Sequence, residues 1–194
     1  CHSQMIRPIF SEVKRYGEYS KPGEFVYDRP FQWGSRRIGP DLAREGVIQP
    51  SSWWHYLHFM EPDQITAGSI MPSYRHLADQ ELDFDAILPR VQSMALLGVP
   101  YGDAVTNAAE MAREQAIALN EQITLESTSQ GGEPTDIADR KMIALIAYML
   151  RLGTDINKPA PEEAVPDDPA AESESPSSES PNEEAAANPE TEAN

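Results

Sequence analysis

Cys1-His2-Ser3-Gln4-Met5 begins the sequence, and Ser69-Ile70-Met71-Pro72-Ser73-Tyr74 follows further along the chain. A cysteine directly followed by histidine is the second half of Cys-x-x-Cys-His, the pattern that attaches a c-type haem and supplies one iron ligand. A methionine in a proline-bounded turn is a usual second ligand. Because the first half of the pattern is missing, we expect the sequence to be a piece of a longer protein. These two stretches decide the fold, since both would lie against one haem.

Seven methionines are candidates for the iron ligand opposite His2. Met5 is too close to His2 along the chain to reach the far side of a haem. Four others fall in expected helices, where packing is the commoner role of methionine: Met94, Met111, Met142 and Met149. Met60 and Met71 remain. Met71 is the better placed, because it lies in an irregular segment before a proline, although a core methionine is the plain alternative.

The Gly39-Pro40 turn offers a second contact for His2. A ligating histidine usually donates its other ring N–H to a carbonyl, which fixes the orientation of the ring. The Pro40 carbonyl, in a rigid turn, is suited to that role. Arg36 and Arg37 precede the turn and are candidates to pair with haem propionates, with a solvated basic pair as the plain alternative.

His55, His58 and His76 raise a weaker alternative, a metal site of another kind. His55 and His58 lie three residues apart on one helical face, and His76 could join them. A structural zinc site normally has four ligands that include cysteine or carboxylate, and nothing else in the sequence has that spacing. We therefore expect satisfied surface or core histidines, although one of them could replace Met71 as an iron ligand.

Charge and cysteine content limit the classes of protein. The 194 residues carry a net charge of −17, and residues 161–194 hold 11 of the 32 acidic residues and none of the 15 basic ones. The rest is only mildly acidic, which gives no support to a nucleic-acid partner. A single cysteine excludes an internal disulfide framework. No stretch reaches the roughly 20 apolar residues of a membrane span, but a sequence that lacks its start could not show an anchor.

The periodicity of the sequence predicts a mainly α protein with long irregular loops and no substantial sheet. Residues 3–38 are expected to form an ordered irregular loop, because glycine and proline interrupt any period. Helices are predicted at 53–59 with a cap at 50–52, from Asp83 or Asp85 to Leu97, at 103–127, and at 136–152 with Thr135 as cap. Residues 1–156 are expected to form a haem-binding domain, and residues 157–194 a disordered acidic tail rich in Pro, Ala, Ser and Glu.

Longer blocks of the sequence resemble one family. They are CHSQMIRP (1–8), RYGEYS (15–20), GEFVYDRPFQWGS (23–35), GPDLAR (39–44), SIMPSY (69–74), LGVPY (97–101), ALIAY (144–148) and LGTDI (152–156). In content and order these blocks closely resemble the monohaem cytochrome c subunit, subunit II, of cbb3-type cytochrome c oxidases. The resemblance covers residues 1 to about 156.

The resemblance implies a cytochrome c-like domain with one c-type haem, attached through Cys1 and bound by His2 and Met71. It implies a non-catalytic electron-transfer subunit of a respiratory oxidase, with a haem–copper catalytic subunit and a dihaem cytochrome c subunit as partners. It also implies an upstream transmembrane helix that places the haem domain on the periplasmic side of the bacterial inner membrane. The sequence departs from the family pattern in lacking the first cysteine and the anchor helix, and in its acidic tail.

Two other interpretations stay open. A free-standing or differently partnered c-type cytochrome would carry the same ligands, and an apolar span upstream of Cys1 would argue against it. A haem-free helical module would instead use the aromatic loop to bind a protein. The absorption spectrum distinguishes that module from any cytochrome.

Overall fold

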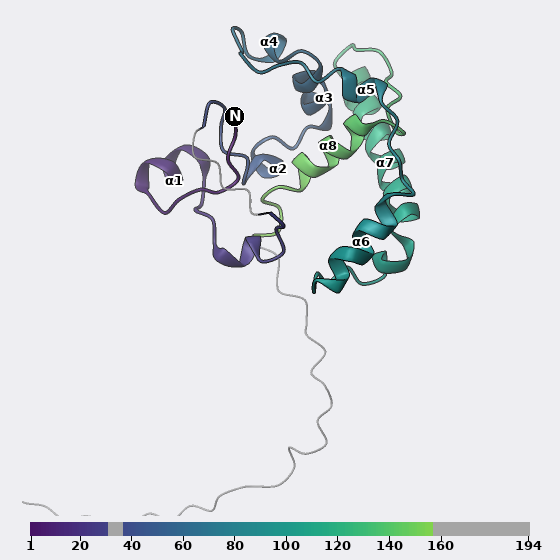
Figure 1. Cartoon of the computed structure of the whole chain (residues 1–194). Helices are drawn as coiled ribbons and strands as arrows, with labels where there is room; N and C mark the ends of the chain where they lie inside the picture. The colour runs from purple at the N-terminus through teal and green to yellow at the C-terminus, as the bar shows by residue number, and fades with distance from the viewer. Residues whose placement is uncertain (31–36, 157–194) are drawn as a thin grey trace, which may run out of the picture. The chain divides into compact units, whose positions relative to one another are not determined.

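Three helices, α3, α7 and α8, pack against one another at the centre of the computed structural model (Figure 1). The structure describes residues 1–30 and 37–156, all within one compact unit, Cys1–Lys158. Its helical elements are α1 (Phe10–Tyr16), the 3-10 helix η1 (Pro22–Phe25), α2 (Glu45–Ile48), α3 (Ser52–Met60), α4 (Pro62–Ile65), α5 (His76–Asp79), α6 (Ile87–Leu96), α7 (Ala104–Ser129) and α8 (Lys141–Arg151). Within the described ranges, β pairing is limited to an isolated bridge between Glu81 and Arg140, so the mainly α prediction is confirmed.

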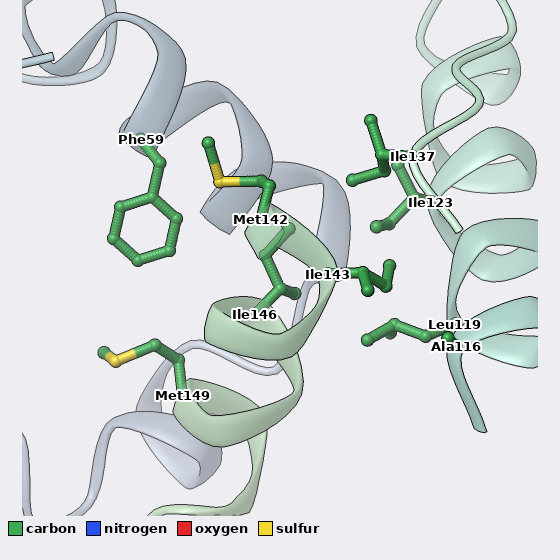
Figure 2. Packing of buried hydrophobic residues seen from close by; sticks show 9 residues of the cluster. All are labelled: Phe59, Ala116, Leu119, Ile123, Ile137, Met142, Ile143, Ile146 and Met149. Carbon is green, nitrogen blue, oxygen red and sulfur yellow. The ribbon is translucent and has the colours of Figure 1, made fainter. Parts of the chain in front are cut away.

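The main hydrophobic core lies between these three helices. Its buried members are Phe59, Ala116, Leu119, Ile123, Ile137, Met142, Ile143, Ile146 and Met149. Figure 2 shows Met142 and Met149 of α8 extending to the side where Phe59 of α3 lies, whereas Ile143 points toward Leu119 of α7. Helix α8 therefore has buried apolar side chains facing both α3 and α7. Each large side chain buried in this way contributes about 1.5–3 kcal/mol.

The predicted helices at 53–59 and 103–127 are confirmed as α3 and α7. The Ser51 hydroxyl accepts the backbone N–H of Trp54 at 3.1 Å, which is the expected N-cap bond of α3. Helix α3 ends at Met60, and Pro62 is the first residue of the next helix, α4. None of the helices in the described part of the chain is both long and apolar enough to cross a membrane.

The expectation of an irregular loop over residues 3–38 was wrong for Phe10–Tyr16, which form α1. This helix has seven residues, no side-chain cap, and only Tyr16 buried, so it carries no apolar stripe that a periodicity search could detect. Glu12 in its first turn and Lys14 and Arg15 in its last turn match the helix dipole. Contacts between Glu12 and residues outside α1 stabilise this helix, and the local sequence does not show them.

The predicted start of the last helix was also wrong, because α8 begins at Lys141 and not at residue 136. The backbone carbonyl of Asp139 accepts the N–H of Leu82 at 2.8 Å, and Lys141 donates its N–H to the Gln80 carbonyl at 2.9 Å. These bonds hold Arg140 in an extended conformation. Pairing with a segment some sixty residues away therefore overrides the local helix signal.

Gly46 allows α2 to pack directly on the end of α8. Its N–H donates to the Leu152 carbonyl at 3.0 Å, and a Cβ at this position would lie 2.2 Å from the Leu150 carbonyl oxygen. Backbone cannot move aside as a side chain can. We expect Gly46→Ala to lower the free energy of unfolding by about 1–3 kcal/mol in urea denaturation.

The matched control for that substitution is Gly23→Ala, because a Cβ at Gly23 meets no atom within 4 Å. Its free energy of unfolding should stay within about 0.5 kcal/mol of the parent. Equal stability of the two variants would contradict the close packing of α2 on α8.

Candidate functional site

Backbone hydrogen bonds clamp the first residues of the chain to the turn at residues 38–42. The Cys1 carbonyl accepts the N–H groups of both Ile38 and Gly39 at 2.9 Å, and the Ser3 carbonyl accepts the N–H of Leu42 at 2.8 Å. His2 is thereby fixed between two anchored neighbours. The turn that was singled out in the sequence lies directly against the candidate iron ligand.

The His2 ring is oriented by this turn. Its Nδ1 donates to the Pro40 carbonyl at 2.9 Å, which is the contact expected from the sequence. The ring also lies against the backbone of Gly39, where a Cβ would come within 2.3 Å of His2 Cε1. With Nδ1 engaged, Nε2 is the ring nitrogen left for a ligand.

The buried carboxylate of Asp41 accepts hydrogen bonds from both of these segments, the first residues of the chain and the turn. Its side chain is fully buried, and it accepts the Ser3 hydroxyl, the Met5 N–H at 3.1 Å and the Ala43 N–H at 2.9 Å. Arg37 Nε also donates to it at 3.3 Å. The negative charge is therefore compensated, and Asp41 fixes the chain immediately after Pro40.

Arg37 extends the same network to α1. It donates to Glu12 at 2.9 Å and to the Met5 carbonyl at 2.8 Å, and its guanidinium lies over the Tyr16 ring at 5.0 Å. Together with the bond to Asp41, these contacts commit Arg37 to partners within the protein. Arg36, the other candidate for a propionate, lies outside the described residues.

The hydrogen bond from Arg37, supported by one from Arg7, lowers the pKa of Glu12 from 4.5 to about 2. A carboxylate with a lowered pKa stabilises the fold above the unfolded-state value, and loses that contribution as the pH falls from about 4.5 toward 2. We expect Glu12→Gln to cost roughly 1–3 kcal/mol at pH 7 and little near pH 2, measured by denaturation across that range.

Glu110→Gln, at an exposed position of α7, is the control for this effect and should leave the pH profile of stability unchanged. The opposite result is that the stability of Glu12→Gln falls with acid as steeply as that of the parent. The pair of Glu12 and Arg37 would then be excluded as the cause of the acid-dependent loss of stability.

Contacts with the end of α3 hold the segment that carries Met71. The last carbonyls of a helix lack intrahelical partners, and here residues just after Met71 supply them. Tyr74 donates its N–H to the Phe59 carbonyl at 2.8 Å, while the Ser73 hydroxyl and Arg75 Nε donate to the Met60 carbonyl at 2.8 and 3.1 Å. Met71 therefore lies in a loop whose far end is fixed.

Met71 is partly buried and packs against the main core, and so does Met60. The Met71 N–H donates to the Ser69 hydroxyl at 3.2 Å, and the preceding turn is closed by a bond from the Gly68 N–H to Asp63 at 2.7 Å. Both candidate methionines thus belong to an ordered region at the end of α3, and Met71 is the one carried by a loop.

The three remaining histidines do not form a metal site. His55 is fully buried, its Nε2 donates to the Gln49 carbonyl at 2.9 Å, and burial lowers its pKa, so it is the satisfied core histidine that was expected. His58 stacks on Trp54, and His76 lies near Tyr74. Within residues 1–30 and 37–156, no group of three His, Cys, Asp or Glu side chains is placed to hold a metal ion.

The candidate site has two halves: residues 1–5 with the turn at residues 38–42, and the loop that carries Met71. They supply the donor types that the iron of a c-type haem takes, an imidazole with one nitrogen already engaged and a thioether in a fixed loop. Cys1, the attachment residue expected from the sequence, is a free and exposed thiol. The lack of a side chain at Gly39 is what lets the imidazole lie against the turn.

The sequence did not indicate which residues brace the site, and it offered Arg37 only as a candidate partner for a haem propionate. Asp41, Arg37 and Glu12 form one network, and Gly39 is required by the His2 ring. Asp41 directly follows Pro40 in the turn. Acidic residues are common in turns, so this position alone did not indicate that Asp41 is buried. Glu12 left no signal, because its partner in the network, Arg37, lies 25 residues away.

Comparison with family models gives a match over residues 1–156, to the family described as "Cytochrome C oxidase, mono-heme subunit/FixO". Comparison with curated proteins gave no match. The matched range contains both halves of the candidate site.

Proposed function

Because this chain belongs to the FixO family of mono-haem cytochrome c oxidase subunits, we propose that it is the electron-transfer subunit of a cbb3-type haem–copper terminal oxidase. A bound haem supplies a one-electron couple between ferric and ferrous iron. The chain's task is to hold that group, set its ligands and exclude further ones. Electrons would then pass toward the subunit that reduces oxygen.

We propose that His2 and Met71 would bind the haem iron, that Cys1 would attach the haem and that Pro40 orients His2. The observation that carries this assignment is the hydrogen bond from His2 Nδ1 to the Pro40 carbonyl at 2.9 Å. It leaves Nε2 for a ligand and raises the basicity of the imidazole. A thioether as second ligand favours the ferrous state and raises the reduction potential.

Two protein ligands leave no open coordination site, which suits a carrier and not a catalyst. The chain supports the role of a carrier by holding in place the two segments that carry these ligands. Asp41 and Arg37 brace the turn that holds His2, and Ser73 and Arg75 brace the loop that holds Met71. Ligands held in this way need little rearrangement when the charge on the iron changes.

The family supports, at a coarse level, the partners and the location that we propose. Family membership supports a place in a cbb3-type oxidase complex and an association with the membrane. We propose the haem–copper catalytic subunit and the dihaem cytochrome c subunit as neighbours, and the periplasmic side of the bacterial inner membrane as the site of the haem domain. The family match ends at residue 156, which supports a domain boundary there and a separate tail at 157–194.

The absorption spectrum tests this function. The protein produced in a host that attaches c-type haem should show the narrow reduced bands of a six-coordinate c-type cytochrome, and the haem should resist extraction by acidified acetone. Cys1→Ala should lower the fraction of resistant haem. A protein without reduced bands would exclude electron transfer through haem, whereas extractable haem would exclude only the covalent attachment.

A further inference from the structure

The two halves of the candidate site are built on different clusters of buried side chains. The half that carries His2 has a small cluster of its own, formed by Ile6, Tyr16 and Ala43. Met71 instead packs against the main core between α3, α7 and α8. The position of one candidate iron ligand relative to the other therefore depends on the contacts that join the two halves.

Helix α8 is in contact with both halves. It packs on α3, and the last carbonyls of α3 hold the Met71 loop. Beyond the end of α8, the Leu152 carbonyl accepts the N–H of Gly46 in α2, and Leu42 of the turn packs against the main core. Figure 1 shows α8 running from α5 at its start to α2 at its end. This helix is therefore the element that connects the two ligand segments.

A side-chain hydrogen bond joins α8 directly to the segment that carries His2. The amide nitrogen of Gln4 donates to the hydroxyl of Tyr148 at 2.5 Å, although the two residues are 144 positions apart. Within the described part of the chain, the other hydrogen bonds of residues 1–5 go to residues 37–42. Gln4 is therefore the residue through which this segment is bonded to α8.

We propose that the Gln4–Tyr148 hydrogen bond fixes the spacing between His2 and Met71, and that Tyr148 is thereby a positioning residue for the second iron ligand. This rests on the haem-binding function proposed above. Ligands of a metal site must be held within about 0.5 Å of their bonding geometry. Met71 is held from α3 and His2 from the turn, so a shift of one half against the other lengthens the bond from the sulfur to the iron.

The hydroxyl of Tyr148, and not its ring, carries this effect. The side chain is 47% exposed, so the bond to Gln4 lies at the surface and water can replace either partner. The net contribution of such a bond is modest, and its loss should weaken the hold on Met71 roughly 2- to 5-fold without unfolding the site.

Tyr148→Phe and Gln4→Leu test the bond, because each removes one partner and keeps the bulk of the side chain. The full chain with attached haem is oxidised and titrated with cyanide, which replaces the thioether on ferric iron, and the sulfur-to-iron charge-transfer band is followed. We expect the apparent Kd for cyanide to fall roughly 2- to 5-fold in either variant, and the reduction potential to fall as well. The double variant should show no more than either single change, because the bond is already lost.

Two control substitutions separate this role from a general loss of stability. Tyr101→Phe makes the same chemical change at another exposed tyrosine and should leave the cyanide titration unchanged. Thr124→Val removes the hydrogen bond from the Thr124 hydroxyl to the Thr135 carbonyl at 3.0 Å in another part of the fold. It should lower the free energy of unfolding and leave both the cyanide affinity and the reduction potential at the parental values.

Three results would overturn the proposal. The first is a Tyr148→Phe protein with the parental cyanide affinity and reduction potential, and the second is a double variant in which the two single effects add. The third is an equal change in Thr124→Val, which would trace the effect to stability alone. Gln4→Leu decides the matter if Tyr148→Phe does not fold. A parent protein without haem, or without the sulfur-to-iron band, would instead overturn the proposed function, so the two failures are distinguishable.

Discussion

Met71→Ala is expected to abolish the sulfur-to-iron charge-transfer band of the ferric protein and to lower its reduction potential, by on the order of 0.1 V or more within the range of about 0.8 V that axial ligands span. The thioether favours ferrous iron, and alanine has no atom that can replace it. The loop itself should persist, because its fixed points are backbone and side-chain bonds of Ser73, Tyr74 and Arg75. The absorption spectrum of the oxidised protein and a redox titration measure both effects.

Met60→Ala is the matched control, because Met60 packs against the same core and was the other candidate from the sequence. It should lose some stability, about 2–5 kcal/mol if its site does not collapse, and keep the charge-transfer band. The reverse pattern, with the band lost in Met60→Ala and kept in Met71→Ala, would make Met60 the ligand.

Gly39→Ala is expected to displace the His2 ring and so weaken its bond to the iron. The added methyl would lie 2.3 Å from His2 Cε1, and since a side chain gives way more easily than backbone, the ring should move and lose the Pro40 carbonyl. Loss of such an orienting contact typically costs 10–100-fold in ligand affinity. Displacement of His2 by added imidazole should therefore occur at correspondingly lower concentration.

The control is again Gly23→Ala, whose methyl meets nothing. It should resist imidazole as the parent does. If Gly39→Ala also keeps the parental response, the turn does not orient the iron ligand, and the assignment of Pro40 fails with it.

Local sequence was sufficient for the parts of the fold that are stabilised locally. The Ser51 cap and the long apolar spacing of α7 are contained in consecutive residues, and both helices were predicted. The errors at α1 and at the start of α8 have a common cause. Glu12 pairs with Arg7 and Arg37, both outside α1, and the Asp139 carbonyl pairs with Leu82, so neither element could be delimited from its own residues.

The candidate site divides in the same way. Cys1, His2 and Met71 belong to patterns whose chemistry is tied to residue type, so they could be named before any geometry was known. Gly39 and Asp41 could not be assigned a role, because what they do depends on a close approach between segments 38 residues apart. His58 was considered as a possible ligand, but the burial of its Nδ1 without a hydrogen-bond partner depends on the fold and could not be read from the sequence.

The tether of the Met71 loop to α3 bears on how the protein folds. The half of the site that carries Met71 is closed by contacts within residues 59–75. The half that carries His2 is closed by contacts within residues 1–42. Loop-closure entropy grows slowly with length, so the larger half costs only about 1 kcal/mol more to close than the smaller one. We therefore expect each half to close without the other and their docking to come later. A haem joined to Cys1 would be carried by one finished half when it meets the other, and we expect refolding to be faster with the group attached than without it.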